Sequence, residues 1–453
     1  MRILFAGIVA SILVTSTWAA PSSDGSISLL ELYCEARTQD PQILSARYRA
    51  LSDQARQDEA FGQLLPQLSA NAQINRTRRS GDVPTEYYNN QRYTLSLSQH
   101  IYNKPVWENY NRFKYMARQG ELEAEDIQAE AAVELARRYF TVLASYDELE
   151  LIEAELRTTQ KSLDQAEAML TKQRIPKNEA LQLQARVATL HARTIEAQNQ
   201  VTLGLEALTE LVGRSIAESL RPIRSDVKFS APQEPMDTWV QRTLINNKAL
   251  LAQGYGVEAA EAAVREGRGG HYPSVSLNVS SQRSDVGYDN VTAPRTNSFI
   301  ASVNVNVPIF SGGSTHSRYK GLYNDMLSSK QSYEAIRRQL VKESTSAYLT
   351  LQSSVNKIDA LHQAKDAAYE SRIASEAMFA RNLINAVDML SSVEQEYTAR
   401  RDLLQTHYDF IINRLMLSRW AGAFSEQSIF DVNVWLEGAT PKPTSDDVDY
   451  QCN

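Results

Sequence analysis

The sequence has few of the residues and motifs that identify an enzyme or a metalloprotein. Its 453 residues include two cysteines and six histidines, and the histidines are scattered without metal-ligand spacing. The sequence contains no glycine-rich phosphate loop, and its Ser, His and Asp residues form no grouping that a helical layout would bring together. We therefore expect no catalysis, no metal and no cofactor.

Long hydrophobic runs are also missing beyond the first residues. No later segment approaches the roughly 20 consecutive apolar residues of a membrane-spanning helix, although 43% of the residues are hydrophobic. The net charge is −7, and the basic residues form no block of the kind that follows a nucleic-acid backbone. If the chain spans a membrane, it must use strands, and we expect no nucleic-acid partner.

The first residues have the form of a secretory signal peptide. Arg2 precedes an apolar run from Ile3 to Val14, and small residues end the segment at Ala19. The run is short for a bilayer span, and Pro21 follows at once. We expect residues 1–19 to be a signal peptide; a short buried or anchoring helix is the alternative.

The two cysteines, Cys34 and Cys452, lie near opposite ends of the expected mature chain. In an oxidising compartment they form a disulfide if the chain ends meet, and otherwise they stay two separate thiols. The sequence leaves both possibilities open.

The chain does contain a pair of strand-like segments, and it contains this pair twice. The segments span about residues 67–76, 93–102, 274–282 and 299–310. Each alternates apolar with polar residues, as a strand with two different faces does, so that one face can meet lipid and the other water. The side chains predicted to line water are Ser69, Asn71, Thr94, Ser96, Ser276, Asn278, Asn304 and Asn306.

Two long helical stretches follow each pair of strands. They span residues 106–175 and 178–212 in the first half, and 314–383 and 386–421 in the second. At about 1.5 Å per residue, the first would be roughly 100 Å long. Apolar residues at strict seven-residue spacing predict a left-handed coiled-coil seam along it, at Leu135, Val142, Leu149, Leu156, Leu163 and Leu170.

The two halves can be aligned with offsets that drift from 207 to 209 residues, as a duplication with small insertions would produce. The matched pairs are Pro66 with Pro273, Tyr102 with Phe310, and Gly213 with Gly422. We predict two structural repeats, a linker or equatorial segment between them, and a C-terminal equatorial segment with a mobile tail. Their expected ranges are 20–213 and 236–422 for the repeats, 214–235 for the linker, and 423–453 for the C-terminal segment.

Short motifs stand where the first helix begins and where strands begin and end. They are Leu32-Tyr33, Ala36-Arg37, Asp40-Pro41, Leu64-Leu65-Pro66-Gln67-Leu68, Ser98-Gln99-His100-Ile101-Tyr102, Gly270-His271-Tyr272-Pro273 and Val307-Pro308-Ile309-Phe310-Ser311-Gly312-Gly313. Each motif is weak, but their order, duplication and spacing resemble those of the TolC-type outer-membrane exit ducts. The resemblance covers essentially the whole mature chain.

The resemblance implies an α+β membrane protein in which each chain contributes four strands to a shared 12-stranded trimeric β-barrel. The long helices would form coiled-coil hairpins that build a periplasmic tunnel. The sheet also needs strands from other chains. In hydrocarbon every backbone N–H and C=O group must be hydrogen-bonded within the protein, and an open four-stranded sheet has two unpaired edges. Small barrels start at about eight strands, so strand number alone allows two or three chains, and the resemblance implies a homotrimer.

The implied function is the outer-membrane channel-tunnel of a tripartite efflux or type I secretion system in a Gram-negative bacterium. Such a duct passes drugs, other small molecules or unfolded proteins to the exterior. Its partners would be outer-membrane lipid, a periplasmic adaptor protein and an inner-membrane transporter of the ABC or RND type. The alternative is a periplasmic coiled-coil adaptor or scaffold without its own pore, and the cargo stays open.

The family places acidic residues just past the turn between the long helices, where they form a ring at the periplasmic constriction. By motif, Asp388 and Ser391 hold the two positions in the second half, and Glu179 is the corresponding carboxylate in the first. The alternative for Asp388 is an ordinary acid near the positive end of a helix dipole.

Relatives lock the closed state with an arginine and a tyrosine near this turn. Here Ile384 and Phe379 hold those positions, so Arg381 and Arg174 are the candidates for a substitute. The hairpin tips are the expected docking surface for the adaptor, at Ile175, Pro176, Lys177, Asn178, Leu383, Ile384, Asn385 and Ala386.

Overall fold

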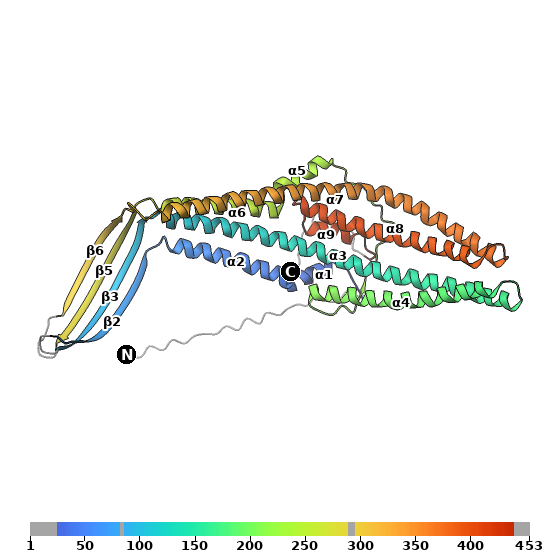
Figure 1. The fold of residues 1–453 in the computed structure, drawn as a ribbon, viewed down its shortest axis with the longest axis horizontal. Coiled ribbons are helices and arrows are strands. Elements are labelled where there is room, and N and C mark those ends of the chain that lie inside the picture. Colours follow the sequence, from blue (N-terminus) through green and yellow to red (C-terminus); the bar gives the residue numbers. More distant parts are fainter. Residues whose placement is uncertain (1–24, 82–85, 289–294, 439–453) are drawn as a thin grey trace.

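The computed structural model describes residues 25–81, 86–288 and 295–438, and these form an elongated molecule (Figure 1). A sheet occupies one end, and helices run from it to a tip at the other. The expected signal peptide, residues 1–19, lies outside the described residues. The elements are β1 (Ser26–Ile27), α1 (Leu29–Gln39), α2 (Pro41–Gly62), β2 (Gln67–Arg79), β3 (Glu86–Tyr102), α3 (Lys104–Thr171), α4 (Lys177–Val212), β4 (Ser219–Leu220), α5 (Met236–Asn246), α6 (Lys248–Gly269), β5 (Ser274–Tyr288), β6 (Thr296–Asn306), α7 (Ser314–Ala380), α8 (Ala386–Trp420) and α9 (Glu426–Asn433).

One order of elements occurs twice along the chain. The series α1, α2, β2, β3, α3, α4 recurs as α5, α6, β5, β6, α7, α8. The lengths nearly match: α3 has 68 residues and α7 has 67, while α4 has 36 and α8 has 35. The two halves therefore place equivalent elements at equivalent positions.

The sheet has four antiparallel strands in the order β2-β3-β5-β6. The three strands β2, β3 and β5 reach further than the predicted segments, because ladder pairing continues after the apolar alternation ends at residues such as Asn89 and Asn90. The fourth is shifted along the chain, since β6 begins at Thr296 rather than at Phe299 and ends at Asn306 rather than at Phe310. Pro308 lies just beyond it and has no N–H to donate to a ladder.

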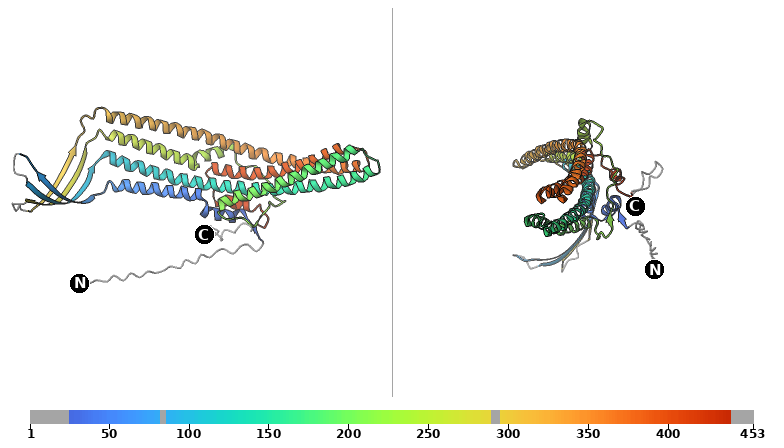
Figure 2. Two further views of the ribbon diagram at one scale, coloured as in Figure 1. Left: turned by 60° about the horizontal axis from the view of Figure 1, so that its bottom comes forward. Right: turned by 90° about the vertical axis from the view of Figure 1, so that its right-hand side faces the viewer.

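The long helices form two antiparallel hairpins, α3 with α4 and α7 with α8. In the half near the tip the neighbouring helices follow the order α4, α3, α8, α7, and in the half near the sheet the order is α2, α3, α6, α7. The end-on view shows that this single layer curves into an open arc (Figure 2). Among the described helices, none carries an apolar stretch sufficient for a transmembrane span.

The predicted seam of α3 is only partly correct. Leu135, Val142 and Leu163 are buried, but Leu149, Leu156 and Leu170 are only half-buried. The buried line shifts toward the tip because α3 packs against α4 on one side and α8 on the other, which widens the buried stripe. There it alternates steps of three and four residues, at Ile152, Glu155, Thr159, Ser162, Ala166 and Met169.

The middle of the molecule holds the largest hydrophobic core. Its members include Leu32 and Tyr33 of α1, Phe140 of α3 and Ile411 of α8. The segment predicted as a linker, 214–235, contributes β4, which pairs in parallel with β1. The C-terminal segment contributes α9, and residues 439–453, which include Cys452 and most of the predicted mobile tail, lie outside the described residues.

Candidate functional site

The eight polar positions predicted to line water lie on one face of the sheet. The register pairs Ser69 with Ser96, Asn71 with Thr94, and Ser276 with Asn304. Directly paired residues of an antiparallel ladder share a face, as do alternate residues of one strand. The remaining two, Asn278 and Asn306, fall on the same face because they lie two residues from Ser276 and Asn304.

The opposite face of the sheet is apolar and exposed. One of its rows runs across all four strands through Leu68, Leu97, Val279 and Ala301. The exposed fraction of Leu68 is 68% and that of Val303 is 60%. Water does not stabilise such a surface, so this face is suited to contact with hydrocarbon.

The turns at the two hairpin tips adopt one conformation. Gln173 and Asn382 have positive φ angles of 56° and 60°. The Arg174 N–H then donates to the Met169 carbonyl at 2.9 Å, and the Leu383 N–H to the Met378 carbonyl at 3.0 Å. This is the six-to-one bond of a Schellman motif, which satisfies a carbonyl at the helix end. The turns match at an offset of 209 residues, which puts Glu179 and Asp388 at the same place in α4 and α8.

The tips are partly closed by their own hydrophobic packing. Ile175 is 5% exposed and Ala386 is 0% exposed, and both belong to a cluster with Phe379 and Met389. These two docking candidates are therefore not at the surface of the described chain. Among the other candidates Ile384 is half-buried, and the exposed ones are Pro176, Lys177, Asn178, Leu383 and Asn385.

The candidate gate carboxylates differ in their surroundings. Asp388 is exposed in the first turn of α8, where its N–H donates to Asn385 Oδ1 at 2.9 Å. Ser391 is also exposed. Glu179 is half-buried, and within the described residues its buried Oε2 has no hydrogen-bond partner.

The candidate lock arginines, Arg174 and Arg381, are both exposed. In the described part of the chain neither forms an ion pair with a carboxylate. Instead, the Asn382 side chain donates to the Arg174 carbonyl at 3.1 Å, which joins the two tips. One chain thus connects its tips through an amide and a carbonyl rather than through an arginine and an acid.

Sequence reasoning missed two buried carboxylates inside the hairpins. Glu155 of α3 pairs with Arg186 of α4 at 2.6 Å, and Glu396 of α8 pairs with Arg372 and Arg400. Both carboxylates are almost fully buried. A signal for Glu396 exists in the sequence, since it interrupts a line of apolar residues at seven-residue spacing: Met389, Leu403, Phe410 and Leu417.

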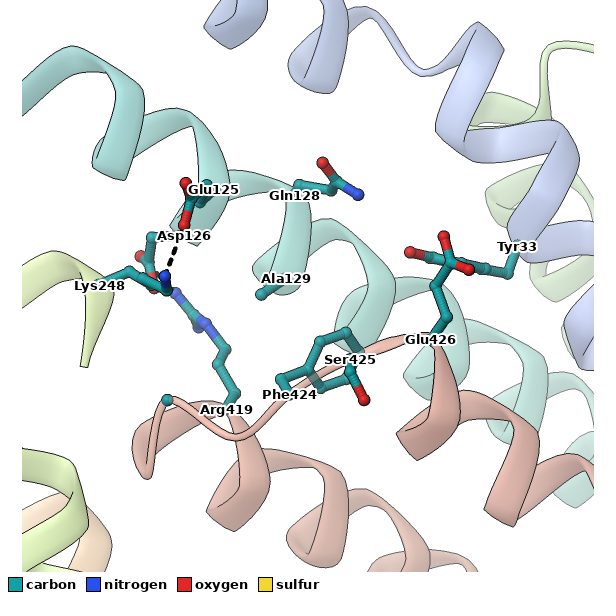
Figure 3. Close-up of a pocket in the computed structure, with 11 residues that line it drawn as sticks. Tyr33, Glu125, Asp126, Gln128, Ala129, Lys248, Arg419, Phe424, Ser425 and Glu426 are labelled. Atoms are coloured by element: carbon teal, nitrogen blue, oxygen red, sulfur yellow. Dashed lines mark hydrogen bonds and ion pairs between the residues drawn. The ribbon is translucent and has the colours of Figure 1, made fainter. Parts of the chain in front are cut away.

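A cavity of about 350 Å³ lies at the middle of the molecule, between α1, α3, α6 and the segment after α8 (Figure 3). Four of its charged side chains form two ion pairs across it, and the fifth, Glu426, pairs with Arg37 outside it. Arg419 lies 3.0 Å from Asp126, and Lys248 lies 2.6 Å from Glu125. These two ion pairs join α8 and α6 to α3, and within each pair the charges of cation and carboxylate offset each other.

Comparison with known proteins gives a match on both halves of the chain. The family model described as "Outer membrane efflux protein" matches residues 32–214 and 239–423. Outer membrane protein TolC of Vibrio cholerae is 27% identical over 453 residues, which cover 96% of this chain and 98% of that protein. The alkaline protease secretion protein AprF of Pseudomonas aeruginosa is 25% identical, over 94% of this chain and 91% of its own length.

Solved structures show the same fold. The Campylobacter jejuni CmeC outer membrane channel superimposes with a TM-score of 0.80. The superposition covers 97% of this chain and 98% of that chain, at 14% sequence identity.

Proposed function

The chain belongs to the outer membrane efflux protein family, and from this premise we propose that three copies of it close into one channel. It is an exit duct of the outer membrane for efflux and type I secretion, and its helices build the long periplasmic part. The alternative of a periplasmic adaptor without a pore is not favoured. No step of this function requires catalysis.

The proposal rests above all on the sheet, which has one polar face, one apolar face and two free edges, at β2 and β6. In hydrocarbon an unpaired edge leaves backbone N–H and C=O groups without partners. If β6 of one chain pairs with β2 of the next, three chains give a closed barrel of twelve strands. The polar face, with Asn71 and Asn304, would then line the water-filled lumen.

The helical arc has two apolar edges that support the same assembly. On α4, Leu181, Ile195 and Leu203 are 50%, 68% and 53% exposed. On α7, at the other edge of the layer, Leu349 is 51% exposed and Ile373 is 42% exposed. Large apolar side chains along free edges are typical of protein interfaces. Contact between two different edges, repeated around an axis, closes a ring.

In such a ring the second-hairpin turns of three chains would bring their copies of Asp388 together at the narrow end of the tunnel. Ser391 and, in the first hairpin, Glu179 would lie nearby. Three carboxylates close together repel anions and attract cations. We propose that these residues form the periplasmic constriction, with Arg174 and Arg381 available for contacts between chains.

The exposed tip residues, including Pro176, Lys177 and Leu383, form the proposed docking surface for a periplasmic adaptor. Through it the duct would connect to an inner-membrane transporter of the ABC or RND type. One relative is named for protease secretion and another structure for an outer membrane channel. We propose that the cargo is either small molecules or unfolded protein.

The assembly can be tested at the α4 edge. Ile195→Glu places a charge on the proposed interface between chains, whereas Gln200→Glu adds the same charge to an exposed position more than a third of a turn away around α4. Native mass spectrometry in detergent should find a trimer for the wild type and for the Gln200 variant, and mostly smaller species for the Ile195 variant. A monomeric wild type that still conducts ions in a planar bilayer would contradict the proposal.

A further inference from the structure

Three arginines that form no ion pair with any described carboxylate lie on the apolar face of the sheet, at the end far from the helices. Arg283 pairs with Tyr93, and Tyr93 with Ala72, which puts Arg283 on the same face as Leu95. On β2, Arg76 and Arg78 follow Ala72 at steps of two residues and therefore share this face. We call Arg76, Arg78 and Arg283 the arginine belt; all three are exposed.

The height of the belt follows from strand geometry. Val275 lies in the row of Tyr102, next to the helices, and Arg283 lies eight residues further along β5 (283 − 275). At about 3.4 Å per residue this is roughly 27 Å along the strand, or about 20 Å along the barrel axis after a tilt of about 40°. The apolar band of such barrels is about 25 Å tall. Arg283 thus falls near the far border of the band. Arg76 and Arg78 lie four and six residues past the same row along β2, roughly 14 and 20 Å along the strand, and therefore above the band.

No described carboxylate neutralises the belt. Within the described residues none of the three arginines has an ion-pair partner, whereas the neighbouring Arg295 pairs with Asp285 at 2.8 Å. The guanidinium carbons of Arg76 and Arg78 each lie 5.9 Å from the centre of the Tyr87 ring. A tyrosine between arginines at the border of an apolar band suits the headgroup level of a membrane.

We propose that the arginine belt binds the phosphate groups of phosphorylated lipids in the outer leaflet of the membrane. The proposal rests on the proposed function, in which the apolar face meets hydrocarbon. The helices lie in the periplasm, so the far end of the sheet reaches the outer leaflet (Figure 1). Guanidinium groups bind phosphate oxygens with two parallel hydrogen bonds, and the apolar band directly below receives the acyl chains of the same lipid. Free phosphate would use only the first of these contacts.

The experiment compares two variants of the full-length protein with the wild type. In the belt variant Arg76, Arg78 and Arg283 are each changed to Gln. The control is Arg92→Gln, because Arg92 pairs with Gln73 and Ser284 on the polar face and lies next to the belt in height. Each protein is purified in detergent and titrated with bisphosphorylated lipid A, with dephosphorylated lipid A and with inorganic phosphate. Native mass spectrometry counts the bound lipid, and planar-bilayer recordings check that each protein forms a pore.

A basic side chain near an anionic lipid surface contributes about a fivefold factor in affinity. We expect the belt variant to bind bisphosphorylated lipid A at least about tenfold more weakly than the wild type, with unchanged conductance, and the Arg92 variant to match the wild type. Equal binding by the belt variant, or an equal loss in the Arg92 variant, would overturn the proposal. Competition by inorganic phosphate at equal concentration would show an anion site rather than a lipid site. A wild type that forms no pore would instead refute the proposed function.

Discussion

The Tyr408 hydroxyl of α8 donates a 2.5 Å hydrogen bond to the Asp147 carboxylate of α3. Tyr408 is 6% exposed, and burial raises the pKa of Asp147 while the bond to Tyr408 partly offsets this. Two helical turns away along α8, Arg401 pairs with Glu148 at 2.5 Å. Polar bonds thus join the two hairpins of one chain directly below its central core.

Changing Tyr408 to Phe should destabilise the protein, because the Asp147 carboxylate then stays half-buried without its donor. An unsatisfied buried group costs about 1 to 3 kcal/mol. The thermal unfolding midpoint should fall accordingly, whereas Tyr146→Phe, at an exposed tyrosine beside Asp147, should change it little. Equal midpoints for the two variants would show that the bond is not stabilising.

His407 should make the stability of the chain depend on pH. Burial, with a smaller contribution from His362, lowers the pKa of His407 to about 4, from an ordinary value of 6.5. Between these values the unfolded state binds a proton that the folded state does not, so stability is complete above about pH 6.5 and falls toward pH 4. At about pH 5 the free energy of unfolding should be ~1–2 kcal/mol lower than at neutral pH, allowing for the partly exposed ring of His407.

The His407→Gln variant should therefore lose less stability than the wild type between neutral pH and about pH 5. The change in unfolding midpoint between these two conditions measures the effect. His191→Gln, at an exposed histidine of α4, should retain the pH dependence of the wild type. If the unfolding midpoint of the His407→Gln variant fell as much between these two conditions as that of the wild type, His407 would not be the source of the pH dependence.

The two faces of the sheet should respond differently to a new charge. Leu97 lies in the middle row of the apolar face, and Ser96, its neighbour in the chain, lies on the polar face. If the sheet closes into the proposed membrane barrel, Leu97→Arg should destabilise that barrel by about 2 to 4 kcal/mol, the cost of arginine near the bilayer midplane. Ser96→Arg should assemble normally and change ion selectivity, and the yield of folded protein in outer-membrane fractions measures both. If the two variants assembled equally, the assignment of the faces would be wrong.

Neutralising Asp388 should change the flow of ions through the tunnel. If three copies form the constriction, Asp388→Ala removes three negative charges and should lower cation selectivity and block by divalent cations. The control is Asp402→Ala, because Asp402 is also exposed and lies fourteen residues later on α8, at the same heptad position. Reversal potentials and single-channel currents in planar bilayers provide the test. An Asp388 variant that conducts like the control would exclude this residue from the constriction.

Local patterns in the sequence were enough to predict the strand pairs, their faces and the helical hairpins. Period-two alternation and long stretches without proline are properties of neighbouring residues, and they need no knowledge of distant contacts. For the same reason Asp388 could be placed in the first turn of a helix that follows a tight turn.

The rest depended on contacts between residues far apart in the chain. Pairing with β5 extends β3 beyond its apolar pattern, and packing against two neighbours selects which leucines of α3 are buried. The clustering of Ile175 with Ala386, more than 200 residues later, removes both from the tip surface. The arginine belt likewise exists only because strand register puts Arg283 on the face of Arg76. Sequence by itself determined the elements and their two-sided character; the tertiary structure decided which side chains meet, because burial and pairing depend on neighbours that no local pattern specifies.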